Sequence, residues 1–120
     1  MREGRYLTRA AQYESVYSKG GSWVGDLVVV KALPNGLDLH RCGFSIGRRV
    51  GKAVARNRVK RLLREVLRQT PLKPGWDIIV IARPPAAKAN YRDLETAVNG
   101  LLFRAGLSVG EYEEVCPRID

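Results

Sequence analysis

The stretch Val-Lys-Arg-Leu-Leu-Arg-Glu-Val-Leu-Arg, at residues 59–68, sets the architecture expected for the chain. Its apolar residues recur at i, i+3, i+4, i+7 and i+8, the pattern of a helix that buries one face. These residues are Val59, Leu62, Leu63, Val66 and Leu67. The opposite side of the same helix carries mostly Lys and Arg. The pattern predicts a helix that packs on a core and presents a cationic ridge to solvent.

The positive charge of the chain is concentrated around this helix. Of the 120 residues, 21 are Lys or Arg and 12 are Asp or Glu, which gives a net charge of +9. Residues 48–68 hold nine basic residues against one acidic residue, Glu65, so +8 of that charge lies there. A helix that is merely solvated usually carries acidic residues for i,i+4 pairing, and this one has almost none. We therefore expect a polyanionic partner to bind at this segment.

Strand-like segments precede the basic helix. Residues 23–33 are β-prone with Gly25 as a candidate break, and residues 34–36 form a strong turn signal. Residues 40–47 alternate in character, as a half-buried strand does. The positions that would face the core are His40, Cys42, Phe44 and Ile46. The other face carries small residues: either a ligand backbone approaches the sheet there, or the glycines only ease packing.

Three further elements complete the pattern. Residues 9–19 predict a first helix with Thr8 as its N-cap and glycines at its end. Residues 77–82 are almost continuously apolar, as expected of a strand buried on both faces. Asn90 is placed to cap a last helix that runs to about residue 105. The order is αβββαβα, or αββαβα if residues 23–33 form a single strand, which predicts one α+β domain.

The ends of the chain and its cysteines add little. We expect a folded domain over residues 1–107 and an acidic tail over residues 108–120. Cys42 and Cys116 are too few for a disulfide framework and are interpreted as core thiols. No stretch approaches the roughly 20 apolar residues of a membrane span, and no signal region follows the first residues. The sequence thus predicts a cytoplasmic protein.

Catalytic signals are weak. His40 is the single histidine of the chain and falls on the apolar face of a strand, where a packed side chain is the more frequent case. The acidic residues are scattered and do not resemble the carboxylate set that holds the metals of a protein nuclease. We therefore predict neither catalytic residues nor a metal site, and expect any catalytic groups to come from a partner.

Residues 43–65 carry more than charge. Their sequence, GFSIGRRVGKAVARNRVKRLLRE, closely resembles the signature of the bacterial ribonuclease P protein family, centred on Arg56-Asn57-Arg58. Residues 13–17, Tyr-Glu-Ser-Val-Tyr, and the glycine that follows them resemble the aromatic first helix of that family. The resemblance spans roughly residues 5–107.

The resemblance implies a fold and an activity. The fold is a two-layer α/β sandwich in which the basic helix joins parallel strands by a left-handed crossover, an exception to the usual handedness. The activity is Mg²⁺-dependent removal of the 5′ leader from precursor tRNA by a holoenzyme whose catalytic RNA holds most of the magnesium. The protein subunit binds that RNA and the leader. No DNA or membrane partner is implied.

The resemblance also assigns residues to two surfaces. The surface that would bind the catalytic RNA comprises Arg48, Arg49, Lys52, Arg56, Asn57, Arg58, Lys60, Arg61, Arg64 and Arg68. The surface that would bind the leader comprises Tyr13, Tyr17, Val30, Ser45 and Gly47. The family commonly has Ser where this chain has Gly47, so a hydroxyl is missing there. For Tyr13 and Tyr17, a role in the core alone is the alternative.

Two other functions compete with this one. A ribosome-associated or general nucleic-acid-binding module would explain the charge but not the ordered run of residues 43–65. An autonomous protein nuclease would need a base and metal ligands that the sequence does not suggest.

Overall fold

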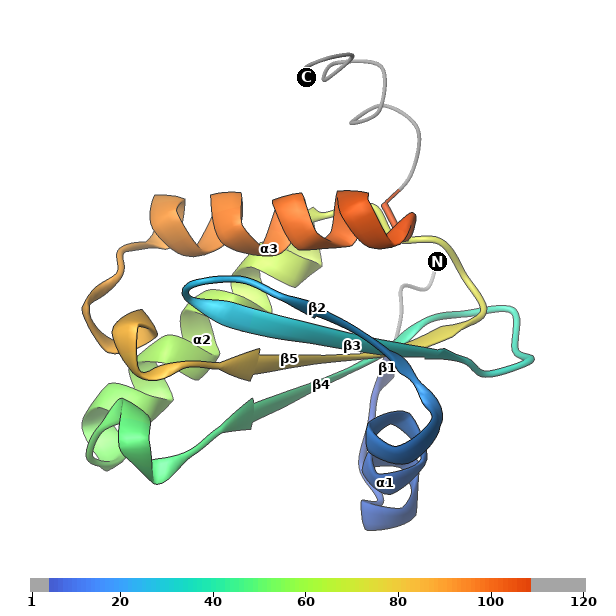
Figure 1. Cartoon of the computed structure of the whole chain (residues 1–120), viewed down its shortest axis with the longest axis horizontal. Coiled ribbons are helices and arrows are strands. Elements are labelled where there is room, and N and C mark those ends of the chain that lie inside the picture. Colours follow the sequence, from blue (N-terminus) through green and yellow to red (C-terminus); the bar gives the residue numbers. More distant parts are fainter. Residues whose placement is uncertain (1–4, 109–120) are drawn as a thin grey trace.

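A five-stranded sheet in the order β1-β4-β5-β3-β2 organises the chain, and three helices pack against it (Figure 1). This computed structural model describes residues 5–108. Its strands are β1 (Arg5–Tyr6), β2 (Gly21–Val24), β3 (Val28–Pro34), β4 (Arg41–Ile46) and β5 (Trp76–Ala82). Its helices are α1 (Ala10–Lys19), α2 (Ala53–Gln69) and α3 (Tyr91–Ala105), with short 3-10 turns η1 (Arg48–Val50) and η2 (Pro84–Lys88). The predicted α+β class and the order αβββαβα are confirmed, and the two-residue β1 precedes them.

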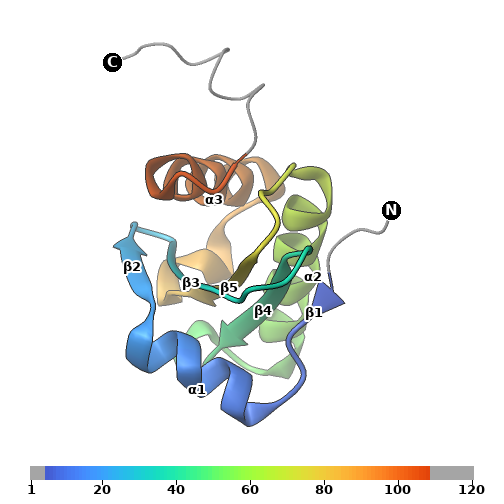
Figure 2. The ribbon, with the colours of Figure 1, turned by 90° about the vertical axis from the view of Figure 1, so that its right-hand side faces the viewer.

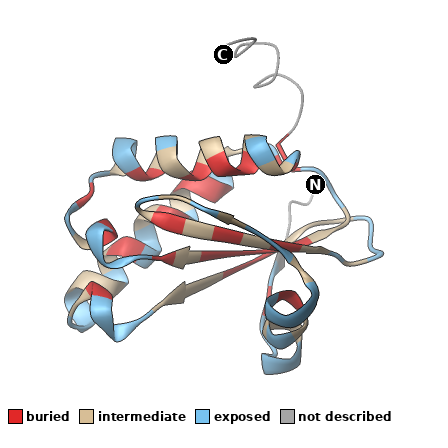
Figure 3. Ribbon diagram, in the orientation of Figure 1, coloured by how far each residue is buried: buried red, intermediate tan, exposed pale blue. Residues whose placement is uncertain are grey.

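The main core lies between one face of the sheet and helices α2 and α3. Alternate residues of β3 and β5 point into it, including Val28, Val30, Ile78 and Val80, all fully buried. Leu63 of α2 meets them from the helix side and is also fully buried. Figure 3 shows the buried positions along the central strands and on the inner sides of the two helices. This part of the molecule is the predicted two-layer sandwich.

Helix α1 adds a partial third layer on the opposite face of the sheet. A smaller apolar cluster of Leu7, Val16 and Ile79 holds it there, with Tyr13 partly buried beside them. Figure 1 shows α1 under the beginnings of β4 and β5, away from their C-terminal ends. One end of this sheet face is thus covered by a helix.

The connection between β4 and β5 runs through η1 and α2. The two strands are parallel neighbours, with Cys42 opposite Ile78 and Phe44 opposite Val80. Figures 1 and 2 together show α2 on the side that makes this crossover left-handed. The implied exception to the right-handed rule is therefore present.

An ion pair ties the beginnings of these two strands together. Arg41 donates hydrogen bonds from Nε and Nη2 to the two carboxylate oxygens of Asp77, each at 2.8 Å. Asn35 donates a further bond to Oδ1 of Asp77 at 2.9 Å. Asp77 is 5% exposed, so its charge is satisfied almost entirely within the protein. The hydrogen bonds to Asp77 hold the pKa of Arg41 above its ordinary value, against the effect of burial.

The N-cap residue predicted from the sequence is correct for α3 and wrong for α1. Asn90 caps α3 as predicted: its side chain accepts from the Asp93 N–H at 2.8 Å. At α1 the N-cap residue is Arg9, and the expected Thr8 cap was wrong. There Gln12 Oε1 accepts from the backbone N–H groups of Thr8 at 2.8 Å and Arg9 at 3.0 Å. A glutamine at the third helical position thus accepts from the backbone N–H groups just before the helix, the bond that a Glu or Gln makes at this position of a capping box.

The described residues include the first residue of the predicted tail and one of the two cysteines. Ser108, which we expected in the acidic tail, forms a bridge with Leu72 and is 3% exposed. Residues 109–120, which carry the rest of the predicted tail and Cys116, lie outside the described residues. Cys42 is a buried free thiol, as predicted.

Candidate nucleic-acid interface

A ridge of long polar side chains runs along the outer side of α2. It consists of Asn57, Lys60, Arg61 and Arg64, all exposed, and we call it the α2 ridge. The helix has this polarity because Val59, Leu63, Val66 and Leu67 are buried on its other side. Before the helix, Arg48, Arg49 and Lys52 are also exposed, so the cationic surface continues into η1 and the following loop.

Arg58 does not belong to this ridge. Its Nη2 donates to the Ala89 carbonyl at 2.9 Å and its Nη1 to the Ala87 carbonyl at 3.3 Å. These bonds fasten α2 to the end of η2, and the side chain is half-buried. The structure thus gives Arg58 an intramolecular role, and its predicted contact with RNA stays a prediction.

Arg68 forms an ion pair with Glu65, the acidic residue of this helix. Its guanidinium lies 2.7 Å from the Glu65 carboxylate, one turn away, and both side chains reach solvent. The hydrogen bonds from Arg68 and then Gln69 lower the pKa of Glu65, so this carboxylate stays ionised near neutral pH. Arg68 therefore offers less free charge than the other exposed arginines of the segment.

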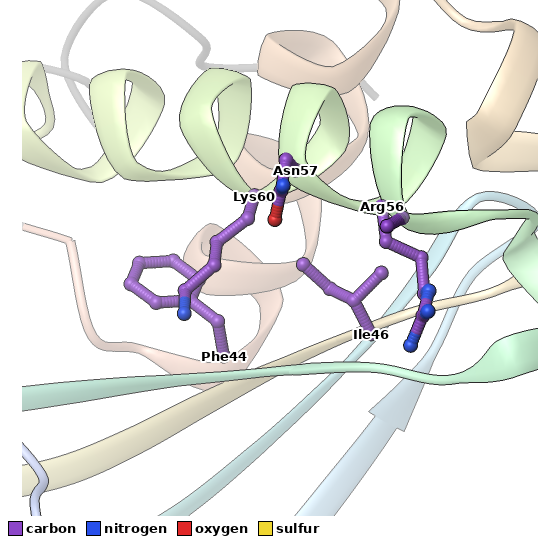
Figure 4. A pocket seen from close by; sticks show the side chains of 6 residues that line it. Phe44, Ile46, Arg56, Asn57 and Lys60 are labelled. Carbon is purple, nitrogen blue, oxygen red and sulfur yellow. The ribbon is translucent and has the colours of Figure 1, made fainter.

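A pocket opens between α2 and the edge of β4. Its volume is about 300 Å³, and it is lined by Phe44, Ile46, Ala53, Arg56, Asn57 and Lys60. Figure 4 shows Arg56 and Lys60 extending from the helix toward the strand that carries Phe44 and Ile46. The Nε of Arg56 is buried and has no hydrogen-bond partner within the described residues. Arg56, which was predicted to bind RNA, thus lines this pocket and is not one of the exposed residues of the α2 ridge.

Phe44, which lines this pocket, has a second aromatic residue, Tyr6, beside it, and the sequence singled out neither of them for binding. The rings of Tyr6 and Phe44 are 6.3 Å apart between centroids and tilted by 48°. The guanidinium carbon of Arg64 lies 5.5 Å from the centroid of the Tyr6 ring, within cation–π range. Tyr6 is 50% exposed although it is a large aromatic residue. A partly exposed aromatic patch thus adjoins the α2 ridge.

The second predicted surface lies on the α1 side of the sheet. Tyr13 is half-buried against Gly43, where a methyl group would lie 2.7 Å from its hydroxyl and 2.8 Å from its ring. The missing side chain at Gly43 therefore makes room for the Tyr13 ring. At this position the glycine eases packing, which was one of the two alternatives. Tyr17, one turn further on, is 40% exposed and remains available to a ligand.

The strand residues of this surface form a row across the sheet. The register places Val29 opposite Ile81 and Ile81 opposite Ser45, and all three are half-buried. Gly47 follows β4, is exposed, and has no atom within 4 Å of where a Cβ would lie. A hydroxyl-bearing residue would fit at that position without strain.

Val30 does not lie on this surface, so its assignment to the leader is corrected. It is fully buried in the main core, on the face covered by α2 and α3. Successive side chains of a strand point to opposite faces, so its neighbour Val29 takes the place expected for Val30.

No catalytic arrangement emerges from the described residues. Within residues 5–108 no three side chains of His, Cys, Asp or Glu gather as metal ligands. Burial raises the pKa of the Cys42 thiol to about 12, with Asp77 adding to the shift, so this thiol is no nucleophile near neutral pH. No described helix is long and apolar enough to cross a membrane.

Comparison with known proteins identifies what this chain resembles. The family model described as Ribonuclease P matches residues 1–106. A ribonuclease P protein component from Dehalococcoides mccartyi is 44% identical over 120 residues, covering 100% of both chains. One from Roseiflexus castenholzii is 38% identical over 117 residues, covering 95% of this chain and 96% of its own.

Solved structures agree in fold. The Staphylococcus aureus RNase P protein superposes with a TM-score of 0.77 at 30% identity, over 86% of this chain and 96% of its own. The protein from Thermotoga maritima gives a TM-score of 0.72 at 31% identity, over 86% and 97% of the two chains.

Proposed function

Because the chain belongs to the ribonuclease P protein family, the protein subunits of an endoribonuclease, we propose that it docks the catalytic RNA on the α2 ridge. From there it assists that RNA in removing the 5′ leader of precursor tRNA. The RNA partner follows from the family, whereas the particular RNA and the surface that holds it are the proposal.

The observation that carries the proposal is the one-sided charge of α2. Lys60, Arg61 and Arg64 stand exposed along one side of the helix, and Arg48 and Arg49 extend the surface into η1. Guanidinium groups bond phosphate oxygens in pairs, and each neutralised phosphate releases counterions that add affinity. Like charges this close repel one another in the free protein, and a polyanion relieves that repulsion.

The α1 side of the sheet is the proposed binding surface for the leader. Tyr17 offers an exposed ring for stacking on an unpaired base, and Ser45 and Val29 lie in the adjoining row. Tyr13 supports that surface from below by packing on Gly43. Gly47 lies at its edge without a hydroxyl.

The magnesium of the reaction is assigned to the RNA. Within residues 5–108 the acidic, histidine and cysteine side chains do not gather into a ligand set. What the protein contributes is positive charge for the RNA and a surface for the leader. We place this work in the cytoplasm, where precursor tRNA is made in bacteria.

The proposed docking surface is tested by salt dependence. The double variant Arg61→Ala/Arg64→Ala removes two exposed charges from the ridge, and its affinity for the catalytic RNA is measured from low to moderate salt. The slope of log affinity against log salt should become shallower by roughly 0.7–0.9 for each phosphate that the variant no longer neutralises.

The matched control carries Lys73→Ala and Lys88→Ala, which remove two exposed charges outside the ridge. Its slope should stay at the wild-type value. Equal slopes for the wild type and the ridge variant would reject α2 as the docking surface. Equal affinity of the wild type for folded RNA and duplex DNA would point instead to a general nucleic-acid-binding module.

A further inference from the structure

The pocket beside α2 combines features that phosphate binding alone does not need. Phosphate groups are held by cationic side chains on an open surface, and the α2 ridge supplies these. The pocket adds an aromatic ring, Phe44, and an aliphatic floor, Ile46, directly below Arg56 and Lys60 (Figure 4). Its volume of about 300 Å³ is at the small end of the range for ligand pockets.

We infer that this pocket holds an unpaired base of the bound RNA, with Phe44 as its aromatic wall, Tyr6 beside that ring, and Lys60 and Arg56 on the attached phosphates. The inference rests on the proposed function, because it takes the α2 ridge as the surface that meets the RNA. It adds recognition of an extruded nucleotide to a surface otherwise assigned to the phosphate backbone.

The aromatic wall is the first support. Tyr6 and Phe44 adjoin each other at 6.3 Å between ring centroids, and Tyr6 is half exposed at the surface. Arg64 lies over the Tyr6 ring at 5.5 Å, so one helix residue links the wall to the ridge. Aromatic rings beside a cationic groove are how proteins bind unpaired bases of RNA.

The open edge of β4 is the second support. β1 pairs with β4 only at Arg41 and Cys42, and the Cys42 carbonyl accepts from the Leu7 N–H on that side. Because backbone groups alternate along a strand, those of Phe44 and Ile46 point to the same side, beyond the end of β1. A base in the pocket would thus meet backbone donors and acceptors able to bond its polar edge.

The buried guanidinium nitrogen is the third support. Arg56 Nε is shielded from solvent and finds no acceptor among the described residues, although buried polar groups are nearly always paired. Because Arg56 lines the pocket, a small shift of its side chain would bring this nitrogen to a phosphate or base oxygen held there. Arg58, on the other flank of the helix, has both of its terminal nitrogens bonded to backbone carbonyls.

The test compares two single-stranded probes that carry the same charge. One is hexaadenylate, and the other is an abasic hexamer with the same ribose phosphates and no bases. The full-length protein should bind hexaadenylate roughly 5- to 150-fold more tightly, as expected for stacking of one base. Phe44→Leu, which keeps an apolar side chain, should remove most of that preference and leave the affinity for the abasic hexamer unchanged.

Two controls keep the result interpretable. Phe103→Leu makes the same change on α3 and should leave both affinities as in the wild type. Thermal unfolding checks that Phe44→Leu folds; if it does not, Tyr6→Leu replaces it, since Tyr6 is half exposed. In the wild type, the Phe44 ring protons should shift in NMR spectra with hexaadenylate and stay in place with the abasic hexamer.

The outcomes separate this inference from the proposed function. Equal affinity of the wild type for both probes, or a preference that survives Phe44→Leu, overturns the base pocket. If Arg61→Ala nevertheless weakens the abasic hexamer, the α2 ridge stands as a phosphate-binding surface. If Arg61→Ala leaves the abasic hexamer unaffected, the docking surface itself is contradicted.

Discussion

The ring of Tyr13 occupies the space that a side chain at Gly43 would need: a methyl group there would lie 2.7 Å from the tyrosine hydroxyl. This approach joins α1 to β4 on the sheet face proposed to bind the leader. It also explains why a glycine stands inside a well-paired strand, since only glycine leaves room for the ring.

Gly43→Ala should therefore destabilise the protein. Forcing Tyr13 away from the strand costs about 1–3 kcal/mol of unfolding free energy, as overpacking of a core does. Urea unfolding measures the loss, and Gly47→Ala, which has open space around it, should change stability by less than about 0.5 kcal/mol. The account fails at this point if the two alanine variants are equally stable.

Alanine substitutions at Arg58 and Arg61 remove the same charge but should have different effects on stability. Arg58→Ala removes the bonds to Ala87 and Ala89, so unfolding free energy should fall by about 1–3 kcal/mol. Arg61 is exposed, so Arg61→Ala should leave stability almost unchanged and weaken RNA binding. Thermal unfolding and RNA titration of both variants check this pair. A larger loss of stability in Arg61→Ala would contradict the assigned roles.

Glu65→Gln should strengthen binding of the catalytic RNA. The change removes the acidic side chain of the basic segment and frees Arg68 from its 2.7 Å ion pair. If Arg68 then reaches a phosphate, the salt slope should steepen by roughly 0.7–0.9. Glu95→Gln, which removes an acidic side chain from α3, is the control. An unchanged slope with Glu65→Gln would mean that Arg68 stays off the RNA.

Tyr17 should distinguish precursor from mature tRNA in the assembled complex. Removing its exposed ring with Tyr17→Ala should weaken binding of the leader-containing precursor by roughly 5- to 150-fold, the value of one stacked base. Mature tRNA has no leader and should bind as before. Tyr17→Phe keeps the ring and should retain the affinity. Equal losses for precursor and mature tRNA would remove Tyr17 from the leader surface.

Cys42 should make the protein less stable in alkali. Its pKa is raised from 9.0 to about 12 by burial, so between these values the unfolded thiol ionises while the folded one stays protonated. The unfolded state then binds fewer protons, and stability falls as pH rises, by at most roughly 1.4 kcal/mol per pH unit. Cys42→Ala should show a shallower decline above pH 9. Parallel curves for the two proteins would contradict the buried thiol.

Much of the fold could be predicted because its signals are local. The Asn90 cap predicted α3 close to its observed extent. The apolar spacing of residues 59–68 predicted the body of α2, which begins earlier, at Ala53. The uniformly apolar run of β5 predicted a strand buried on both faces, as Ile78 and Ile79 are. The two-residue β1 could not be predicted, because it is too short to carry any pattern and depends on its pairing with β4.

The site was predicted less completely, for physical reasons. Val28, Val29 and Val30 are identical in character, so no alternation reveals which of them faces the core, and Val30 was placed on the wrong side. The length of Arg58 lets it reach carbonyls some 30 residues away in sequence, which helical periodicity cannot anticipate. Phe44 was expected in the core, and only the fold makes it line a pocket and brings Tyr6 beside it.

The most direct measurement is cleavage of precursor tRNA at low magnesium, with the catalytic RNA alone, the protein alone, and the two together. Cleavage at the mature 5′ end that needs the RNA and is strongly stimulated by the protein is the predicted result. The Arg61→Ala/Arg64→Ala variant should restore less of this activity at moderate salt. Cleavage by the protein alone, or no stimulation of the RNA despite tight binding, would contradict the account.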